Sequence, residues 1–558
     1  MLSFVQGARA PLQARFFFFR SLLPALIAGS VLLVGCSADT GDEVSRAGKA
    51  TAVPDAAPVA RTEYGQVRGS VEDGINVFKG IRYGADTAST RFQAPAEPAP
   101  WDGVQDALAY GNSCPQIPTG SGGGLFDSWR PQPSPPLSED CLFLNVWTPA
   151  LADGKKRPVM VWFHGGGFAS GNGSSNAYDG VRLAKRGDVV VVTVNHRLNF
   201  FGYLYLGEYG ERFADSGNAG ILDLVASLEW VRDNIESFGG DPDNVLIFGE
   251  SGGGAKVSVL MAMEAAEGLF HRAVVQSGPA LTIAPKEEAA EAGAAVVEKL
   301  GLDADTIGQI LTMPTAKIEE AAREVARSTN LSPGARPVLD GRNFTRHPFA
   351  DGAPPQSKDV PLLIGTTRTE NSLLIGAREP ATFDLTWETL PAALQEPFPS
   401  IDAEAVVQKY RELHPDIDAP ELFFTATTDA GFLNRSIELA DQKAKQNGAP
   451  VYFYLLNWDT PVDGGKWLSP HALEIGMVFD NVAKSESMSG TGPEPQKIAD
   501  MMSEAWLAFA HSGNPNHEGI PEWPAYTVDE RPTMVFDLEP QVINDPHGEQ
   551  RKLFLPEG

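Results

Sequence analysis

The chain has 558 residues, 72 of them acidic and 44 basic, which gives a formal net charge of −28. A surface of this sign repels the phosphate backbone, so the composition argues against a nucleic-acid-binding protein. The length exceeds that of a usual domain, but α/β enzymes with insertions reach more than about 400 residues. We therefore expect one catalytic domain, over residues 61–558.

The first 36 residues have the features of a secretory signal peptide. Three arginines precede the apolar residues 21–35, a stretch that is too short to span a bilayer comfortably. It ends in Leu-Val-Gly-Cys, which resembles the lipobox of bacterial lipoproteins and predicts that Cys36 is acylated. Such a protein would be anchored to a membrane of the cell envelope. The alternative is a cleaved signal with an incidental cysteine, which would leave the protein periplasmic or secreted.

Residues 37–60 are rich in Ala, Asp, Ser and Pro and indicate a flexible linker. With Cys36 acylated, Cys114 and Cys141 can pair only with each other, and an exported chain meets oxidising conditions. A disulfide between them would stabilise the fold by roughly 3 to 4 kcal/mol. Two buried free thiols are the alternative.

From about residue 157, short apolar runs alternate with helical periodicity, which predicts an α/β fold with a large, mostly parallel central sheet flanked by helices. A helix is expected over residues 224–235, ended by Gly239-Gly240. Two segments rich in Ala, Glu and Lys, 286–327 and 402–447, predict helical insertions that roof or flank the site. The expected strands are 159–163, 189–194, 245–248, 273–275, 362–364 and 451–456.

The sequence Gly-Glu-Ser-Gly-Gly at residues 249–253 directly follows one of these strands and matches the motif G-x-S-x-G. Glycines on both sides of a serine permit a sharp turn from strand to helix that exposes the serine oxygen, so Ser251 is the candidate nucleophile. Val257, Leu260 and Met261 then recur at helical spacing. By itself the motif is weak, because an ordinary glycine-rich connection has the same composition.

The strand expected at 159–163 runs into His164-Gly165-Gly166-Gly167, which matches the HGGG-type oxyanion loop of esterases. Successive glycines leave backbone N–H groups unobstructed for the negative charge that develops in acyl transfer. The two motifs occur in the expected order, about 85 residues apart, and this combination is far less probable by chance than either motif alone.

Acyl transfer also needs a base for the serine proton and an acid that orients the base. In this fold both follow the serine, which excludes His164 and His196. His471 follows the strand expected at 451–456 by one loop, where catalytic residues are common. Position alone does not separate His471 from the six remaining histidines, which are His271, His347, His414, His511, His517 and His547.

Glu370 is the candidate acid, because it lies just past the strand expected at 362–364 and between Ser251 and His471 in the chain. The alternative is a solvated glutamate that pairs with Arg368.

Taken together, these strings resemble the type-B carboxylesterase family, which also contains the cholinesterases. The likeness covers most of residues 62–540. It includes SEDCLFLNV at 138–146, FGGDPDNV at 238–245, GTTRTEN at 365–371 and SPHALEI at 469–475.

The resemblance implies an α/β-hydrolase fold and a triad of Ser251, His471 and Glu370. It also implies a disulfide between Cys114 and Cys141, and no metal or organic cofactor. Three backbone N–H groups would bind the oxyanion and two further side chains would lie near the triad. The oxyanion donors are Gly166, Gly167 and Gly252, and the neighbouring side chains are Glu250 and Ser277.

The chain departs from the commonest family pattern at two positions. Gly252 stands where Ala is usual, and Asn371 stands where Gly is frequent. Gly252 still offers its N–H, although a more mobile backbone there would loosen the oxyanion hole or admit a bulkier acyl group.

We therefore expect a serine carboxylesterase that hydrolyses small-molecule carboxylic esters through an acyl-enzyme on Ser251. Phe126 and Trp129, in the loop between the two cysteines, are candidates for the wall of the site, although packing is the commoner role of an aromatic side chain. Two alternatives are a hydrolase of amides, carbamates or lactones with the same triad, and a non-catalytic cholinesterase-like binding protein. Retention of all three triad positions argues against the latter.

Overall fold

The computed structural model describes residues 57–116, 122–350 and 352–555. The expected signal peptide, the lipidation residue Cys36 and most of the expected linker lie outside these ranges. Strand β1 (Val59–Arg61) begins within the last part of that linker. None of the helices in the described ranges combines the length and the apolar character that a membrane crossing requires.

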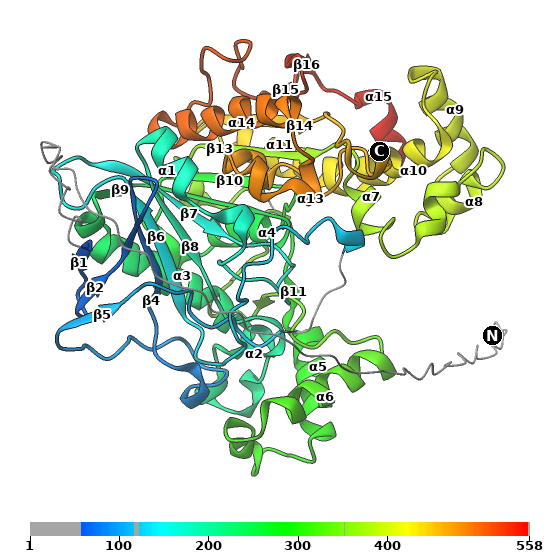
Figure 1. Cartoon of the computed structure of the whole chain (residues 1–558). Coiled ribbons are helices and arrows are strands. Elements are labelled where there is room, and N and C mark those ends of the chain that lie inside the picture. The colour runs from blue at the N-terminus through cyan, green and yellow to red at the C-terminus, as the bar shows by residue number, and fades with distance from the viewer. Residues whose placement is uncertain (1–56, 117–121, 351, 556–558) are drawn as a thin grey trace, which may run out of the picture. The chain divides into compact units, whose positions relative to one another are not determined.

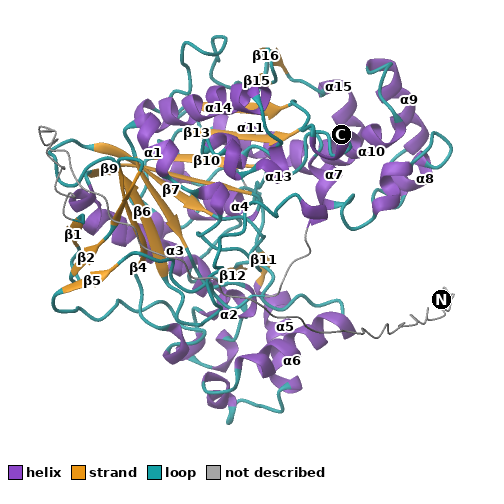
Figure 2. Ribbon diagram, viewed as in Figure 1, coloured by secondary structure: helices purple, strands orange, loops and turns teal. Residues whose placement is uncertain are grey.

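A sheet of 11 described strands forms the centre of the fold, in the order β16-β15-β14-β13-β10-β9-β7-β8-β6-β4-β3 (Figures 1 and 2). The seven strands from β8 to β15 are parallel, and the strands at both ends pair antiparallel. The strands are β3 (Ser70–Glu72), β4 (Ile75–Arg82), β6 (Phe143–Thr148), β7 (Arg157–Phe163), β8 (Val190–Val194), β9 (Gly240–Glu250), β10 (Arg272–Gln276), β13 (Leu362–Thr367), β14 (Val451–Leu456), β15 (Pro532–Phe536) and β16 (Gln541–Asn544). Two small sheets accompany it: β1, β2 (Gln66–Arg68) and β5 (Val104–Asp106) in one, and β11 (Ala284–Pro285) and β12 (Val338–Leu339) in the other.

Both faces of the parallel strands are buried, which explains why these strands read as continuous apolar runs. Along β7, Val159 and Val161 point into a core shared with α3 (Ala219–Asn234), α4 (Gly252–Leu260) and α11 (Asn434–Ala444). Met160 and Trp162, the alternate residues, point into the opposite core. That core is closed by α1 (Val181–Gly187), α12 (Ile475–Val478) and α14 (Pro493–Ser512).

The remaining helices lie in loops and at the periphery. In Figure 1, α5 and α6 lie together at the bottom of the view, and α8 and α9 lie at the right. These helices are α2 (Asn199–Tyr203), α5 (Lys286–Lys299), α6 (Thr315–Ser328), α7 (Glu370–Leu374), α8 (Leu390–Gln395), α9 (Ala403–Leu413), α10 (Ala419–Thr428), α13 (Glu486–Ser489) and α15 (Gly548–Arg551).

The fold class predicted from the sequence is confirmed, and each expected strand overlaps a strand of the parallel part of the sheet, the largest difference at an expected N-terminal end being in β9, which begins at Gly240. The helix expected at 224–235 is α3, and it gives way to a 3₁₀ turn that ends where Gly239 adopts a left-handed conformation, with φ of 76°. The segment 286–327 holds α5 and α6, as expected. The segment 402–447 holds α9 and α10, but its last helix, α11, packs on the sheet itself rather than forming part of an insertion.

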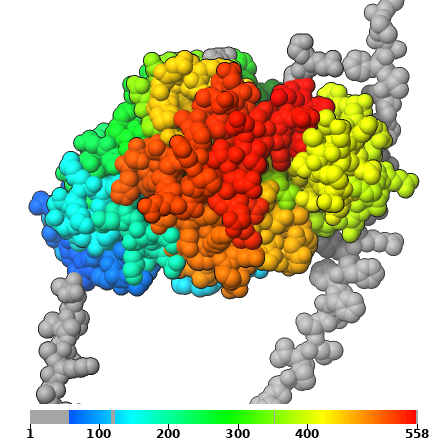
Figure 3. All heavy atoms as spheres, turned by 90° about the horizontal axis from the view of Figure 1, so that it is seen from above, coloured from blue at the N-terminus to red at the C-terminus, as the bar shows by residue number. Residues whose placement is uncertain are grey.

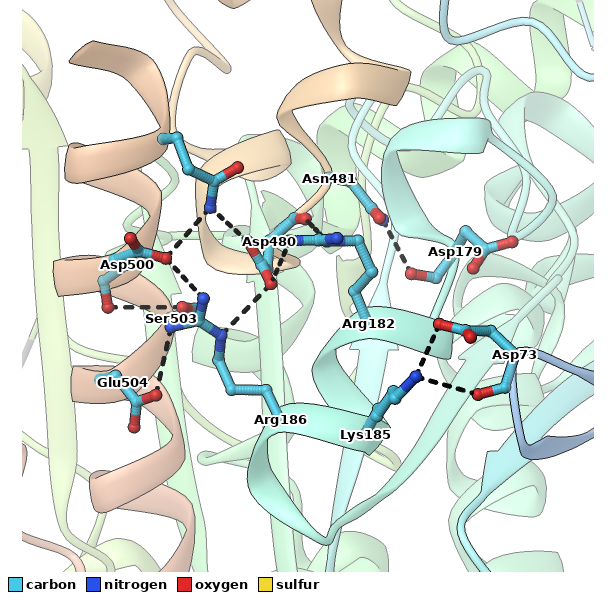
Figure 4. A network of polar contacts seen from close by, with 11 residues as sticks. Asp73, Asp179, Arg182, Lys185, Arg186, Asp480, Asn481, Asp500, Ser503 and Glu504 are labelled. Carbon is cyan, nitrogen blue, oxygen red and sulfur yellow. Dashed lines mark hydrogen bonds and ion pairs between the residues drawn. The ribbon is translucent and has the colours of Figure 1, made fainter. Parts of the chain in front are cut away.

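An ion-pair network fastens α1 to α14 and to the turn that follows α12 (Figure 4). Arg186 lies 3.2 Å from the Asp480 carboxylate, 2.5 Å from Asp500 and 3.1 Å from Glu504, and Arg182 lies 2.9 Å from Asp480. The Asp480 side chain is only 4% exposed, so its two arginine partners replace water. The network fixes the chain a few residues beyond the loop that carries His471.

The end of the chain packs on the helices near residues 400–420, as the red and yellow-green surfaces of Figure 3 show. His414 Nε2 lies 2.8 Å from Gln550 Oε1, and Lys409 Nζ lies 3.1 Å from a Glu549 carboxylate oxygen. Within the fold, His547 and Gln550 both bond the carboxylate of Asp429, the first residue of a one-turn π-helix between α10 and α11.

Arg197 and Asp223 form an ion pair that is almost fully buried. The guanidinium makes two hydrogen bonds to the carboxylate, at 2.8 and 2.6 Å, and the side chains are 2% and 0% exposed. We expect Asp223→Asn to lower the free energy of unfolding by about 3 to 5 kcal/mol, because the Arg197 charge stays buried without its partner. Urea unfolding measures this change.

Asp233→Asn is the matched control, since Asp233 pairs with Arg232 at the surface, where the side chains are 38% and 51% exposed. Its expected cost is below about 1 kcal/mol. Equal costs for the two variants would contradict the stabilising role of the Arg197–Asp223 pair.

Candidate active site

Ser251 occupies the tight turn between β9 and α4, with φ of 57° and ψ of −123°. Its N–H donates to the Gln276 carbonyl at 2.8 Å, and its own carbonyl accepts from Ala255 N–H at 3.0 Å. A left-handed φ is strained for a serine and persists only where the surroundings impose it. Gly253 is required here, because a Cβ at this position would overlap the Phe163 carbonyl oxygen at the end of β7.

His471 and Glu370 are held together by two loops that bond to each other. Glu370 Oε2 accepts from His471 Nδ1 at 2.5 Å, and Glu370 Oε1 accepts from Thr367 N–H at 2.9 Å. Thr369 Oγ1 donates to the Ser469 carbonyl at 2.9 Å, which joins the loop after β13 to the loop before His471. The carboxylate thereby fixes the orientation of the imidazole, the role expected for the acid of a triad.

The opposite edge of the imidazole, at Nε2, contacts Glu250, the residue before the nucleophile. His471 Nε2 lies 3.1 Å from Glu250 Oε1, an ionic contact without the alignment of a hydrogen bond. Ser251 Oγ shares the cavity with His471, but within the described residues it makes no hydrogen bond to the imidazole. In free enzymes such bonds often form only once substrate is bound. Nε2 must therefore exchange Glu250 for Ser251 before it can accept the serine proton.

Three buried carboxylates surround the imidazole. Burial lowers the pKa of His471, but the charges of Glu250 and Glu370 outweigh it and raise that pKa to about 9. Burial raises the pKa of Glu250 well above its usual range, whereas the positive charge of protonated His471 acts in the opposite direction and favours the Glu250 carboxylate. Burial and the charge of Glu370 raise the pKa of Glu474 to about 7. The Glu250 and Glu370 carboxylates therefore favour a proton on the imidazole, which His471 must lose before it can act as a base.

The glycine loop after β7 faces the start of α4. Gly166 and Gly167 adopt left-handed conformations, with φ of 84° and 62°. Within the described residues, the N–H groups of Gly166, Gly167 and Gly252 have no backbone acceptor. Three free donors near Ser251, at the positive end of a helix, suit an oxyanion.

These groups open into a cavity of about 820 Å³, within the usual range for small-molecule sites. Part of its wall belongs to the loop between Cys114 and Cys141, which form the expected disulfide. Phe126 and Trp129 of this loop line the cavity and also pack edge to face on each other, with ring centroids 4.9 Å apart. None of the described lining residues comes from the segments 286–327 and 402–447.

The structure separates His471 from the other candidate histidines and Glu370 from a pairing with Arg368. Among the histidines of the described residues, His471 alone lines the cavity of Ser251. Arg368 pairs with Glu421 and Asp459, at 2.5 and 2.7 Å, instead of with Glu370. His164 and His196 stack on each other, with ring centroids 4.8 Å apart. The other histidines bond elsewhere: His271 to Val245, His347 to Ile283, His414 to Gln550, His511 to Gly187, His517 to Met501 and His547 to Asp429.

Two neighbours of the imidazole were not singled out from the sequence. Glu474, three residues after His471 in the turn before α12, accepts from Tyr454 Oη at 3.2 Å and faces Ser277 Oγ at 3.4 Å. Because Ala472 has a positive φ, this turn is not helical, and no helical spacing indicates the position of Glu474. Phe432, in the π-helix, packs on the imidazole with ring centroids 5.4 Å apart, and nothing in its local sequence indicates this contact.

Within the described residues, no group of three or more His, Cys, Asp or Glu side chains is arranged to hold a metal ion. The candidate residues thus converge as nucleophile, base, acid and oxyanion donors at the carboxyl edge of the sheet. The fold and this site define a hydrolase of the α/β type.

The chain belongs to the carboxylesterase family, whose sequence model matches residues 56–554, and it is a carboxylic ester hydrolase. It is 38% identical over 507 residues to para-nitrobenzyl esterase of Bacillus subtilis, covering 89% of this chain and 98% of that protein. Acylcarnitine hydrolase of Mus musculus is 34% identical over 515 residues, covering 88% and 89%.

Solved structures agree with this assignment. A carboxylesterase of Geobacillus stearothermophilus superposes with a TM-score of 0.75 at 37% identity, covering 89% of this chain and all of that one. An esterase of Clostridium hathewayi, described as hydrolysing aliphatic aromatic polyesters, gives a TM-score of 0.77 at 36% identity, covering 90% and 98%. The relatives favour neither a non-catalytic protein nor an amide, carbamate or lactone hydrolase.

The contact between Glu250 and His471 predicts a specific pH dependence. Only neutral imidazole can accept a proton, so kcat/KM should fall as the pH drops below the pKa of His471. Glu250→Gln removes a charge that raises this pKa, and the acid limb of the kcat/KM profile should move to lower pH by about 1 to 3 units. Glu379→Gln, at an exposed acid, is the control and should leave the limb in place. An acid limb that stays in place or moves to higher pH in Glu250→Gln would disprove the effect of the Glu250 charge on the pKa of His471.

Proposed function

We propose that the chain hydrolyses esters through a covalent acyl-enzyme on Ser251. Ser251 Oγ attacks the ester carbonyl while His471 takes its proton, and the N–H groups of Gly166, Gly167 and Gly252 stabilise the oxyanion. His471 then protonates the leaving alcohol. Water, deprotonated by the same histidine, attacks the acyl-enzyme and releases the acid. Every proton removed from a nucleophile is returned to a leaving group, and no atom changes its oxidation state, so water is the only co-reactant.

The observation that carries this proposal is the bond between Glu370 Oε2 and His471 Nδ1, because the imidazole that it orients lines the same cavity as Ser251. Glu370 supports the imidazolium that forms when His471 takes the serine proton. The N–H groups of Gly166 and Gly167, which have no backbone acceptor within the described residues, support the proposal as donors for the oxyanion.

The cavity wall supports apolar ester substrates of moderate size. Phe126, Trp129 and Tyr178 contribute aromatic surface, and Leu373 and Ile475 contribute aliphatic surface. An apolar wall favours transfer of apolar acyl and alcohol groups out of water. We therefore propose esters such as p-nitrophenyl butyrate as substrates, consistent with the similarity to para-nitrobenzyl esterase.

The nucleophile and the acid can be tested together with p-nitrophenyl butyrate. We expect kcat to fall by about 10⁶-fold in Ser251→Ala and by about 10⁴-fold in Glu370→Gln, since loss of the orienting acid costs less than loss of the nucleophile. Equal activity of Ser251→Ala and the unaltered enzyme would move the nucleophile elsewhere. A Glu370→Gln variant of near normal activity would move the acid elsewhere.

We further propose that the protein is an exported lipoprotein anchored through acylated Cys36. The lipobox-like residues 33–36 support this, and the disulfide suits an oxidising compartment. Cys36→Ser should shift the full-length protein from the membrane fraction to the soluble fraction of a cell that lipidates exported proteins. Unchanged membrane association of that variant would contradict the anchor.

A further inference from the structure

Lys256 lies on α4, five residues after Ser251, and its side chain is fully buried. Its ammonium Nζ donates to the carbonyl oxygen of His164 at 2.8 Å. His164 is the first residue of the glycine loop that carries the candidate oxyanion donors. A side chain of the nucleophile helix is therefore bonded to the start of that loop.

The same ammonium also contacts the far end of the loop. Nζ lies 5.7 Å from the centroid of the Phe168 ring, within the range of a cation–π interaction. His164 and Phe168 flank the three glycines at 165–167, so one cation contacts both ends of the oxyanion loop. No other side chain of α4 hydrogen-bonds this loop within the described residues.

Backbone contacts explain why the distance between loop and helix is critical. A Cβ on Gly252 would overlap the Gly167 backbone, so the loop rests directly on the first turn of α4. No side chain at that point separates the two. A displacement of the loop would move the N–H groups of Gly166 and Gly167 relative to that of Gly252.

Burial of the Lys256 ammonium is costly for the fold, because the charge loses its hydration. Burial lowers the pKa of Lys256 to about 7, although the charge of Glu250, the last residue of β9, partly offsets this effect. Within the described residues the ammonium forms no ion pair. Beside it, burial and then the Lys256 charge hold the pKa values of His164 and His196 well below their usual range, so these stacked rings are neutral. A methionine would fill the same space without a charge.

We propose that Lys256 is a positioning residue for ester hydrolysis, holding the loop 164–168 against the start of α4 so that the oxyanion donors converge. The inference rests on the proposed acyl-enzyme mechanism. Because the donors act on the oxyanion and not on the ground-state ester, Lys256 supports turnover more than substrate binding.

The test replaces Lys256 by methionine and compares kcat and KM for p-nitrophenyl butyrate. Misplacing the oxyanion donors should lower kcat by about 10- to 1,000-fold, while KM changes less than threefold. Affinity for an alkyl trifluoromethyl ketone, which forms an oxyanion adduct with the serine, should fall in parallel with kcat/KM. Affinity for the matching methyl ketone should stay within threefold of the unaltered enzyme.

Lys443→Met is the matched control. Lys443 is also fully buried and donates to two carbonyl oxygens, those of Ser357 and Lys358 at 2.6 and 2.8 Å, but it does not line the catalytic cavity. The Lys443→Met variant should unfold at a lower temperature than the unaltered enzyme, while its kcat stays within twofold. If kcat fell as much in Lys443→Met as in Lys256→Met, the effect of Lys256 would be one of general stability, and the proposal would be wrong.

A folded Lys256→Met variant with kcat within threefold of the unaltered enzyme would overturn the proposal. If that variant does not fold, Phe168→Leu decides, since it removes one of the two contacts of Nζ; an unchanged kcat in a folded Phe168→Leu variant would also overturn it. Absence of ester hydrolysis by the unaltered enzyme, or full activity of Ser251→Ala, would instead refute the proposed mechanism on which the inference rests.

Discussion

Burial of both faces of the parallel sheet is the constraint on which the rest of the structure depends. Helices α3, α4 and α11 cover one face and α1, α12 and α14 cover the other, so the connections must cross outside the strand ends. Parallel strands place all their carboxyl ends at one edge. The ends of β7, β9, β13 and β14 therefore bring together the glycine loop, Ser251, Glu370 and His471 from more than 300 residues of chain.

The apolar runs made the parallel strands predictable, because burial on both faces leaves no polar alternation. Strand β4, beside the edge strand β3, was missed for a physical reason: it carries a bulge between Phe78 and Ile81, where Lys79 and Gly80 interrupt the pattern. The start of β9 was missed because its polar residues Gly240–Asn244 resemble a turn. The motifs around Ser251 and Gly166 could be recognised in the sequence because each is formed by neighbouring residues. The sequence did not single out His471 among seven histidines, because its role depends on contact with Glu370, 101 residues away in the chain.

The electrostatics of the site could not have been read from the sequence either. Glu250 is adjacent to Ser251 in the chain, yet only the turn at Ser251, with its positive φ, directs the two side chains so that Glu250 faces the imidazole. Leu468 and Ala472, on either side of His471, also have positive φ, at 58° and 72°, in a loop whose sequence holds no glycine at these positions. Such strain is imposed by tertiary contacts and is common at functional sites.

The disulfide between Cys114 and Cys141 closes a loop that contributes Gln116, Phe126 and Trp129 to the cavity wall, whereas the triad candidates and oxyanion donors lie outside it. Substrate contact and catalytic machinery are therefore carried by separate stretches of chain. Because the bridge anchors both ends of the loop to the fold, its interior can change in length and sequence at little entropic cost. Natural selection, or a loop-grafting experiment, can therefore replace the loop between Cys114 and Cys141 and change which esters enter the cavity, while the catalytic residues stay the same.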